Sequence, residues 1–284
     1  MTALRRLLAL PGARTLLPFA ALLVVFALAA ILAPWIAPAD PARQSLLARL
    51  RPPGATVGPL TFWLGSDELG RDLLSRVLYG ARASLIVALL SVTVSGAVGT
   101  LLGVLAGHFR GWTEIVVMRA VDMMLSIPAI LLAIITVAVL GPGFINLVLV
   151  LGFTRWPRYT RVAYAQTLAI SNLPYITASR VAGARAPRVL LRHVLPNIAA
   201  PLVVVATLEF GLMVLFEAGL SFLGLGIQPP TPSWGSIMGV GRNYVATAWW
   251  IATFPGICLF LLVLSVNLCG DFLRDRFDPR AMVR

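Results

Sequence analysis

Long apolar segments separated by short polar ones are the dominant pattern along the chain. Two are uncharged runs of 25 residues, and an α-helix needs about 20 apolar residues to cross a bilayer. A third, of 32 residues, contains Gly141-Pro142-Gly143, a turn signal that divides it into two passes, the second of which extends past Arg155. The pattern therefore predicts an all-α membrane protein with six transmembrane helices. The apolar segments are residues 15–39, 83–107, 123–154, 198–223 and 245–270.

The first segment could also be a cleaved signal peptide, because three arginines precede it. The apolar core of a signal peptide is about 7–15 residues long and ends at a small-residue cleavage site. Here the run continues through Pro34-Trp35. We therefore expect an uncleaved transmembrane anchor.

Arginine counts predict the orientation, since cytoplasmic loops carry an excess of basic residues. With the N-terminus inside, the cytoplasmic pieces hold 16 arginines and the outer pieces hold seven. Residues 155–197 alone carry seven arginines and no acidic residue. We expect both termini to face the cytoplasm.

The composition excludes several kinds of catalytic and metal-binding chemistry. The chain is 59% hydrophobic and 12% charged, against about 25% charged in soluble proteins. All 23 basic residues are arginine, which excludes Schiff-base chemistry on lysine and the phosphate-gripping lysine of a P-loop. Cys258 and Cys269 would lie about 16 Å apart on one helix, too far for a disulfide. His108 and His193 each lack a second ligand at metal spacing, so we expect no metal site, cofactor or catalytic site in this chain.

Residues 155–197 are the most informative polar stretch. An arginine at the centre of a bilayer costs about 2.5–3.5 kcal/mol, so we expect this stretch in water or against another protein. Asn172 is a candidate N-cap, with Pro174 in the first helical turn. Charge alone leaves open an ordinary positively charged loop. The expected elements are a helix over 175–182 that ends at Gly183 and a second from Pro187 to His193, which Leu195-Pro196-Asn197 breaks.

The same stretch carries a family resemblance. Tyr175-Ile176-Thr177-Ala178-Ser179-Arg180-Val181-Ala182-Gly183-Ala184, followed by Arg192-His193-Val194-Leu195-Pro196-Asn197, resembles the coupling loop of ABC-importer permeases. Further ordered matches identify the second-type permease subunit of dipeptide, oligopeptide and nickel importers as the most similar family. They are Leu64-Gly65-Ser66-Asp67-Glu68-Leu69-Gly70-Arg71-Asp72, Met118-Arg119-Ala120-Val121-Asp122, the run from Gly219 to Gly226 with Pro229-Pro230 and Trp234-Gly235, and Asn267, Gly270-Asp271, Arg274-Asp275 and Asp278-Pro279-Arg280.

The resemblance implies a type I ABC-importer permease architecture with a coupling loop at about residues 170–195. Its N-terminal helix and periplasmic segment would cover residues 1–79, the transmembrane domain 80–273 and a cytoplasmic tail 274–284. Thr177 and Ser179 stand where the family has glutamate and alanine, which removes the usual carboxylate anchor of the loop. The residues implied to couple to the ATPase are Thr177, Ala178, Ser179, Arg180, Gly183, Ala184 and Arg185.

The other polar positions each have a structural explanation. Arg119 and Asp122, three residues apart, are expected to pair with one another or to neutralise the start of a span. Glu209 falls near the middle of a span, where an unpaired carboxylate is expensive; it could line a translocation path or hydrogen-bond a neighbouring helix. Glu217 is expected in a structural pairing, and Pro196 closes the coupling loop.

Residues 39–82 are too polar to cross the membrane. From about Asp67, leucine and valine recur at helical spacing with arginines between them, which predicts an amphipathic helix on the outer membrane face. That helix could pack against the spans or receive a delivery protein. Pro52-Pro53-Gly54 is expected to break any regular element before it.

The expected function is half of the translocation pathway for di- or oligopeptides in the cell inner membrane. The resemblance implies a second homologous permease, one or two ABC ATPase subunits that bind ATP and Mg, and an extracytoplasmic solute-binding protein; no nucleic-acid partner is expected. The same machinery could import nickel or another metal chelate, glutathione or haem. A secondary transporter would need coupling-ion groups, for which Glu209 is the sole good candidate. An intramembrane serine protease is disfavoured, because no glycine follows Gly219-Leu220-Ser221 at the elbow position.

Overall fold

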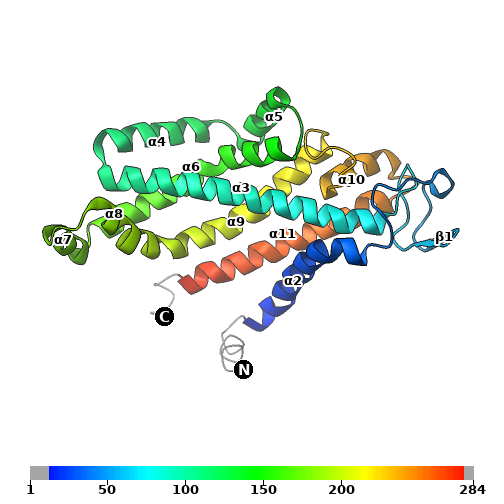
Figure 1. Ribbon diagram of the computed structural model, residues 1–284, viewed down its shortest axis with the longest axis horizontal. Helices are drawn as coiled ribbons and strands as arrows, with labels where there is room; N and C mark the ends of the chain where they lie inside the picture. Colours follow the sequence, from blue (N-terminus) through cyan, green and yellow to red (C-terminus); the bar gives the residue numbers. More distant parts are fainter. Residues whose placement is uncertain (1–12, 278–284) are drawn as a thin grey trace. The chain divides into compact units, whose positions relative to one another are not determined.

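The computed structural model describes residues 13–277 and is built almost entirely from helices (Figure 1). Residues 1–12 and 278–284, which hold parts of both predicted cytoplasmic termini, lie outside the described residues. The α-helices are α2 (Ala13–Ile36), α3 (Leu73–Phe109), α4 (Gly111–Ser126), α5 (Ala129–Leu140), α6 (Phe144–Ser171), α7 (Pro174–Val181), α8 (Ala186–Val189), α9 (Leu195–Phe222), α10 (Trp234–Gly241) and α11 (Trp250–Phe277). Short elements are the 3-10 helices η1 (Leu46–Ala48) and η3 (Arg242–Tyr244), the π-helix η2 (Leu190–Val194), and strands β1 (Ala55–Val57) and β2 (Leu60–Phe62).

Four helices in the described part of the chain are long and apolar enough to cross a membrane, and a bent pair adds a fifth candidate. The bent pair is α4 and α5, which meet at 90° where a single third pass was expected. Ile127 is extended at this bend (φ −101°, ψ 130°), because the residue before a proline is pushed out of the helical region. The four spans are Leu16–Ile36, Leu73–Phe109, Ala186–Phe222 and Trp250–Arg276.

The chain divides into two compact units. Unit 1 contains the residues up to Leu89, Val137–Leu147 and Phe210–Cys269. Unit 2 contains Leu90–Thr136, Val148–Glu209 and the residues from Gly270 onward. The boundaries expected from the family at residues 79 and 273 stay a prediction.

The polar part of unit 1 differs from the sequence expectation. Pro52-Pro53-Gly54 lie outside any regular element, as expected, and an antiparallel hairpin that pairs Ala55 with Phe62 follows them directly. Residues 67–72 form a turn held by Asp67, which accepts from Arg71 Nε at 2.6 Å, so the expected amphipathic helix does not start there. Asp72 Oδ2 instead accepts from the Ser75 backbone N–H at 2.8 Å. This cap begins α3, which continues without a break into the apolar span.

Two tryptophans bind the loops of unit 1 to its helices. Trp234 is fully buried, and its Nε1 donates to the Val77 carbonyl at 3.0 Å. Trp250 Nε1 donates to the Ser66 carbonyl at 3.0 Å. Glu217 is also fully buried and accepts from Ser221 Oγ at 2.7 Å, in keeping with the structural pairing expected of it.

In unit 2, α3 and α6 approach closely because glycines of α3 face the backbone of α6. A Cβ atom added at Gly99 would lie 2.4 Å from the Trp156 carbonyl oxygen, and one at Gly103 would lie 2.4 Å from that of Thr160. Such separations are far below van der Waals contact, so only glycine fits at these two positions. The close packing fixes the rotation of α6 and therefore the direction of its arginines.

Candidate functional site

Helix α6 carries three arginines, Arg155, Arg158 and Arg161, at intervals of three residues. Residues at this spacing lie along one side of a helix. The helix runs without a break from Phe144 to Ser171, so the second arm of the expected hairpin does extend past Arg155. Residues 155–171 are helical and so do not form the loop that charge alone left open, and ion pairs hold these arginines against neighbouring helices.

The most buried of these pairs joins α6 to α9. Arg155 Nε donates to Glu209 Oε2 at 2.7 Å and Arg155 Nη2 to Oε1 at 3.1 Å. Both side chains are more than nine-tenths buried. Bidentate pairing of this kind is the strongest ion-pair geometry available to arginine, and it offsets the cost of burying a charge between two helices. Of the two roles expected for Glu209, the helix-to-helix bond is present.

Arg158 makes a weaker contact with the same carboxylate. Its Nη1 lies 3.4 Å from Glu209 Oε1, and 56% of its side chain is exposed. Arg161 Nη2 donates to Asp122 Oδ1 at 2.8 Å, and both side chains of that pair are more than half exposed. The polar side of α6 therefore changes from fully desolvated at Arg155 to open at Arg161.

The expected ion pair between Arg119 and Asp122 is not the one that forms. The Asp122 carboxylate pairs with Arg161 of α6 instead. Arg119 is exposed. One turn beyond Arg161, the Tyr164 hydroxyl donates to Glu114 of α4. Asp122 and Glu114 of α4 thus both bond to side chains of α6, because the two helices run side by side within unit 2 (Figure 1).

A cavity of about 410 Å³ opens beside these ion pairs. Its polar wall comes from Glu209 and two arginines of α6, and its remaining walls are aliphatic. Small-molecule sites combine a mostly apolar lining with a few placed polar groups in just this way. The lining residues are Leu125, Arg158, Arg161, Val162, Val205, Leu208 and Glu209.

The coupling segment follows α6 in the chain. Helix α7 ends as expected at Gly183, whose φ of +86° is a left-handed conformation that favours glycine. The Ala184 N–H reaches back to the Ser179 carbonyl at 3.1 Å, which is the long bond of a Schellman cap. Asn172 is not the N-cap that was expected, because α7 starts at Pro174 and Asn172 Oδ1 accepts from Arg110 Nη2 at 3.2 Å.

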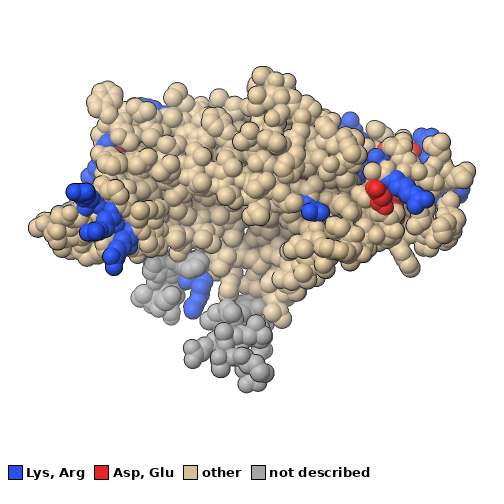
Figure 2. Space-filling view, viewed as in Figure 1, with Lys and Arg blue, Asp and Glu red and all other residues tan. Residues whose placement is uncertain are grey.

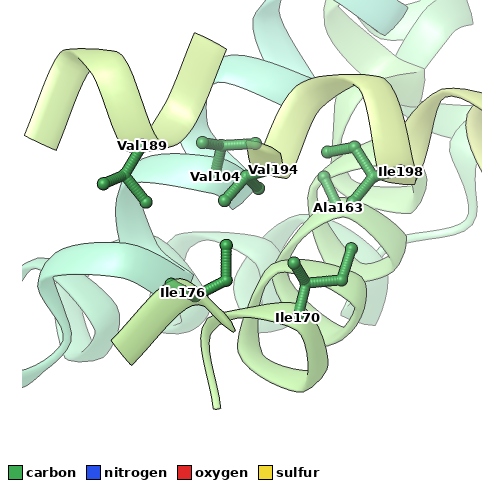
Figure 3. Packing of buried hydrophobic residues seen from close by; sticks show 7 residues of the cluster. All are labelled: Val104, Ala163, Ile170, Ile176, Val189, Val194 and Ile198. Atoms are coloured by element: carbon green, nitrogen blue, oxygen red, sulfur yellow. The ribbon is translucent and has the colours of Figure 1, made fainter. Parts of the chain in front are cut away.

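Two neighbouring side chains attach α7 to the rest of unit 2, and Tyr175 does so by an edge-on ring contact with His193. Ile176 is fully buried and faces the same apolar cluster as Ile170 of α6 and Val194 of η2 (Figure 3). The opposite side of α7 is open, and Val181 is 84% exposed. The side of α7 that carries Val181 therefore lies on the surface of the chain.

The implied coupling residues share that open surface. Thr177, Ala178, Gly183 and Arg185 are exposed, whereas Ser179 and Ala184 are half-buried. The backbone of Arg180 belongs to α7, but its side chain lies outside the described part of the structure. Figure 2 shows arginine side chains gathered over the end of unit 2 that holds α7 and α8.

The expected break at Leu195-Pro196-Asn197 is wrong. Helices α8 and α9 are joined through the π-helix η2 into one run, Ala186–Phe222. A proline inside an α-helix removes a hydrogen bond and clashes with the carbonyl four residues earlier. The wider π-turn directly before Pro196 relieves that clash, so this proline widens the helix and does not end it.

Comparison with known proteins identifies the family. Residues 99–283 match the model of the binding-protein-dependent transport system inner membrane component, and residues 3–53 match the N-terminal transmembrane domain of oligopeptide transport permease C. The first match covers more than half of the chain. This protein belongs to that inner-membrane permease family. The chain is therefore an inner-membrane component of a transport system, which agrees with the resemblance seen in its motifs.

Relatives of this permease cover nearly its whole length. It is 48% identical to the di/tripeptide transport system permease protein DppC of Pseudomonas aeruginosa over 91% of this chain and 85% of that protein. It is 46% identical to the dipeptide transport system permease protein DppC of Escherichia coli over 90% and 86% of the two chains. An inward-facing structure of the methionine ABC transporter MetNI matches with a TM-score of 0.57 at 21% identity, over 71% of this chain and 96% of that one. That likeness supports the permease fold.

The ion pairs of α6 are the feature that sequence reasoning missed. The three-residue spacing of Arg155, Arg158 and Arg161 was visible in the sequence, but the arginines were counted as part of a cytoplasmic loop. A second signal was Glu209, a carboxylate inside an apolar segment that requires a partner. Considered together, these two signals indicate a buried arginine–glutamate contact between helices.

Proposed function

We propose that this permease subunit forms half of the translocation pathway for short peptides in an ATP-driven importer. The observation that carries the proposal is the 48% identity, over nearly the full chain, to a di/tripeptide transport permease. The cavity beside Glu209 supports it, because the site is polar on one wall and apolar on the others. In this proposal the chain binds the peptide and changes conformation during transport, while its partner subunits hydrolyse ATP.

The membrane arrangement in this proposal has six crossings. They are α2, α3, the α4–α5 pair, α6, α9 and α11. The proposal includes α6 as a crossing because its arginines contact acidic residues of α4 and α9, which lowers the cost of placing them in the membrane. The exposed arginines near α7 and α8 support a cytoplasmic position for that end, and the proposal has both termini on the same side.

Coupling in this proposal occurs at α7. A separate ABC ATPase subunit, which binds ATP and Mg, receives the exposed side of α7 in a cleft. Small residues such as Ala178 and Gly183 allow close approach, and Arg185 can engage acidic or carbonyl groups there. Closure of the ATPase pair would displace α7 and move the helices attached to it. A second permease forms the other wall of the path, and a binding protein delivers peptide from outside.

Purification of the chain with its co-expressed neighbours tests the proposal. We expect it to copurify with a second permease and at least one ATPase, and we expect the assembly to import a labelled dipeptide only with ATP and the binding protein. Full transport by this chain alone, in vesicles without ATP, would reject the proposal.

Thiol labelling tests the orientation. Leu46 and Val181 are 81% and 84% exposed, so cysteines at these positions are equally open to a reagent. In intact cells, a membrane-impermeant maleimide should label Leu46→Cys and leave Val181→Cys unlabelled until the membrane is broken. Both cysteines are introduced into a variant in which Cys258 and Cys269 are replaced by alanine, so that the chain has no other thiol to react. Labelling of Val181→Cys in sealed cells is incompatible with a cytoplasmic α7.

A further inference from the structure

We propose that the cavity beside the Arg155–Glu209 pair binds the C-terminal carboxylate of the transported peptide, and that Arg158 is the residue that contacts it. This inference rests on the proposed function, and it adds a substrate-binding residue and the substrate group that the residue recognises. The cavity, its lining and every ion pair used below belong to unit 2.

The ion pairs leave one positive charge in excess around the cavity. Arg155 occupies both oxygens of Glu209, at 2.7 and 3.1 Å, and Arg161 pairs with Asp122 at 2.8 Å. Arg158 has only a shared contact with Glu209, at 3.4 Å. Among the side chains that the structure describes here, three arginines and two carboxylates meet, and an anionic ligand would balance their charge.

The exposed fractions of Arg155 and Arg158 indicate which of the two can contact a ligand. Only 8% of the Arg155 side chain is exposed, so it has no free side toward a ligand. In contrast, 56% of the Arg158 side chain is exposed, and it lines the cavity. A guanidinium presents several N–H groups in one plane and binds a carboxylate through two of them at once.

The other walls of the cavity fit the rest of a short peptide. Leu125, Val162, Val205 and Leu208 are aliphatic, and they can accept an apolar side chain while the carboxylate faces Arg158. A volume of about 410 Å³ lies in the range of small-molecule sites, about 300–1,000 Å³. The ligand class is therefore a small molecule with a carboxylate at one end and an apolar group beside it.

Glu209 makes such binding reversible. The Arg158–Glu209 contact is the longest of the three contacts to that carboxylate. A peptide carboxylate can displace it without disturbing the Arg155 pair, and Arg158 returns to Glu209 when the peptide leaves. A transport site needs this kind of weak, exchangeable contact.

The test measures binding to the assembled importer in lipid nanodiscs without the binding protein, so that no other peptide site contributes. Equilibrium dialysis compares a radiolabelled dipeptide with the same dipeptide amidated at its C-terminus. We expect the wild type to bind the acid about tenfold more tightly than the amide, as for a lost charge-assisted hydrogen bond. Arg158→Gln should abolish this preference, and Arg158→Lys should keep part of it. Arg82→Gln, an exposed arginine of α3, is the matched control and should behave as wild type.

Equal affinity of the wild type for acid and amide would overturn the inference, as would a preference that survives in Arg158→Gln. Absence of saturable dipeptide binding up to millimolar concentration would also overturn it. Each variant is first shown to copurify with its partners, so that misfolding is recognised. The proposed function is judged separately: if the same wild-type preparation imports the dipeptide with ATP and binding protein, that function stands even when the carboxylate site fails.

Discussion

Replacement of Glu209 by glutamine should destabilise the permease strongly, because it removes the carboxylate that pairs with the buried Arg155 guanidinium. Both side chains are more than nine-tenths buried and share two hydrogen bonds. Removing one partner of a buried ion pair costs about 3–5 kcal/mol. Glutamine keeps one acceptor oxygen for Arg155, so the lower end, about 3 kcal/mol, is expected, which is a factor of roughly 100 in the unfolding equilibrium. Arg158 adds little to this value because it is more than half exposed.

The assay is thermal unfolding of the purified assembly in lipid nanodiscs, with wild type and variants side by side. A loss of about 3 kcal/mol lowers the midpoint by about 6 °C or more for a chain of this size. The double variant Arg155→Leu/Glu209→Leu is the informative control, because it removes both charges and fills the space with apolar groups. Replacing a whole buried pair in this way is often neutral, so the double variant should melt close to wild type.

Two results would refute this reasoning. In the first, Glu209→Gln melts together with wild type, which would mean that water or another group already compensates Arg155. In the second, the double variant is no more stable than Glu209→Gln alone, which would mean that the loss comes from packing around residue 209.

Three further predictions concern helix geometry. Gly183→Val should uncouple ATP hydrolysis from uptake in proteoliposomes, because a β-branched residue is strained at φ +86°; Gly183→Asn, which tolerates that conformation, should retain coupling, and equal coupling in both variants would contradict the role of the cap. Ile176→Ala should cost about 2–5 kcal/mol of local stability and expose α7 to limited proteolysis, whereas an unchanged cleavage rate would show that Ile176 is not its anchor. Gly99→Val should prevent assembly, because a Cβ there would lie 2.4 Å from the Trp156 carbonyl oxygen, whereas Gly219→Ala, with nothing within 4 Å, should assemble normally. Copurification with the partner subunits measures both variants, and assembly of Gly99→Val would disprove the close approach of α3 and α6.

Helices whose position depends on nearby residues could be predicted from the sequence. The apolar runs located α2 and α9 to within three residues, because length and hydropathy decide a membrane helix, whereas α11 begins and ends several residues later than its run. The cap at Gly183 was also predictable, since a left-handed helix end favours glycine. The short helix before it followed from Pro174 in its first turn.

Features set by tertiary contacts could not be predicted in this way. The partner of Glu209 is 54 residues away in sequence, and no local pattern selects Arg155 over the other arginines. Arginines in the second half of α6 favour a loop in water by charge alone, whereas acidic residues of α4 and α9 pair with two of them in a continuous helix. The break expected at Pro196 ignored the possibility of a π-turn, which depends on packing around η2.

The uninterrupted run from Ala186 through η2 into α9 gives a mechanical connection between the two sites. Glu209 lies 23 residues beyond Ala186, about 35 Å along the helix axis. A swing of about 5° around the Ala186 end would carry Glu209 sideways by about 3 Å over this distance, more than its 2.7 Å contact with Arg155 can absorb. A small displacement at the Ala186 end of this helical run is therefore large enough, at Glu209, to break the ion pair that joins α9 to α6.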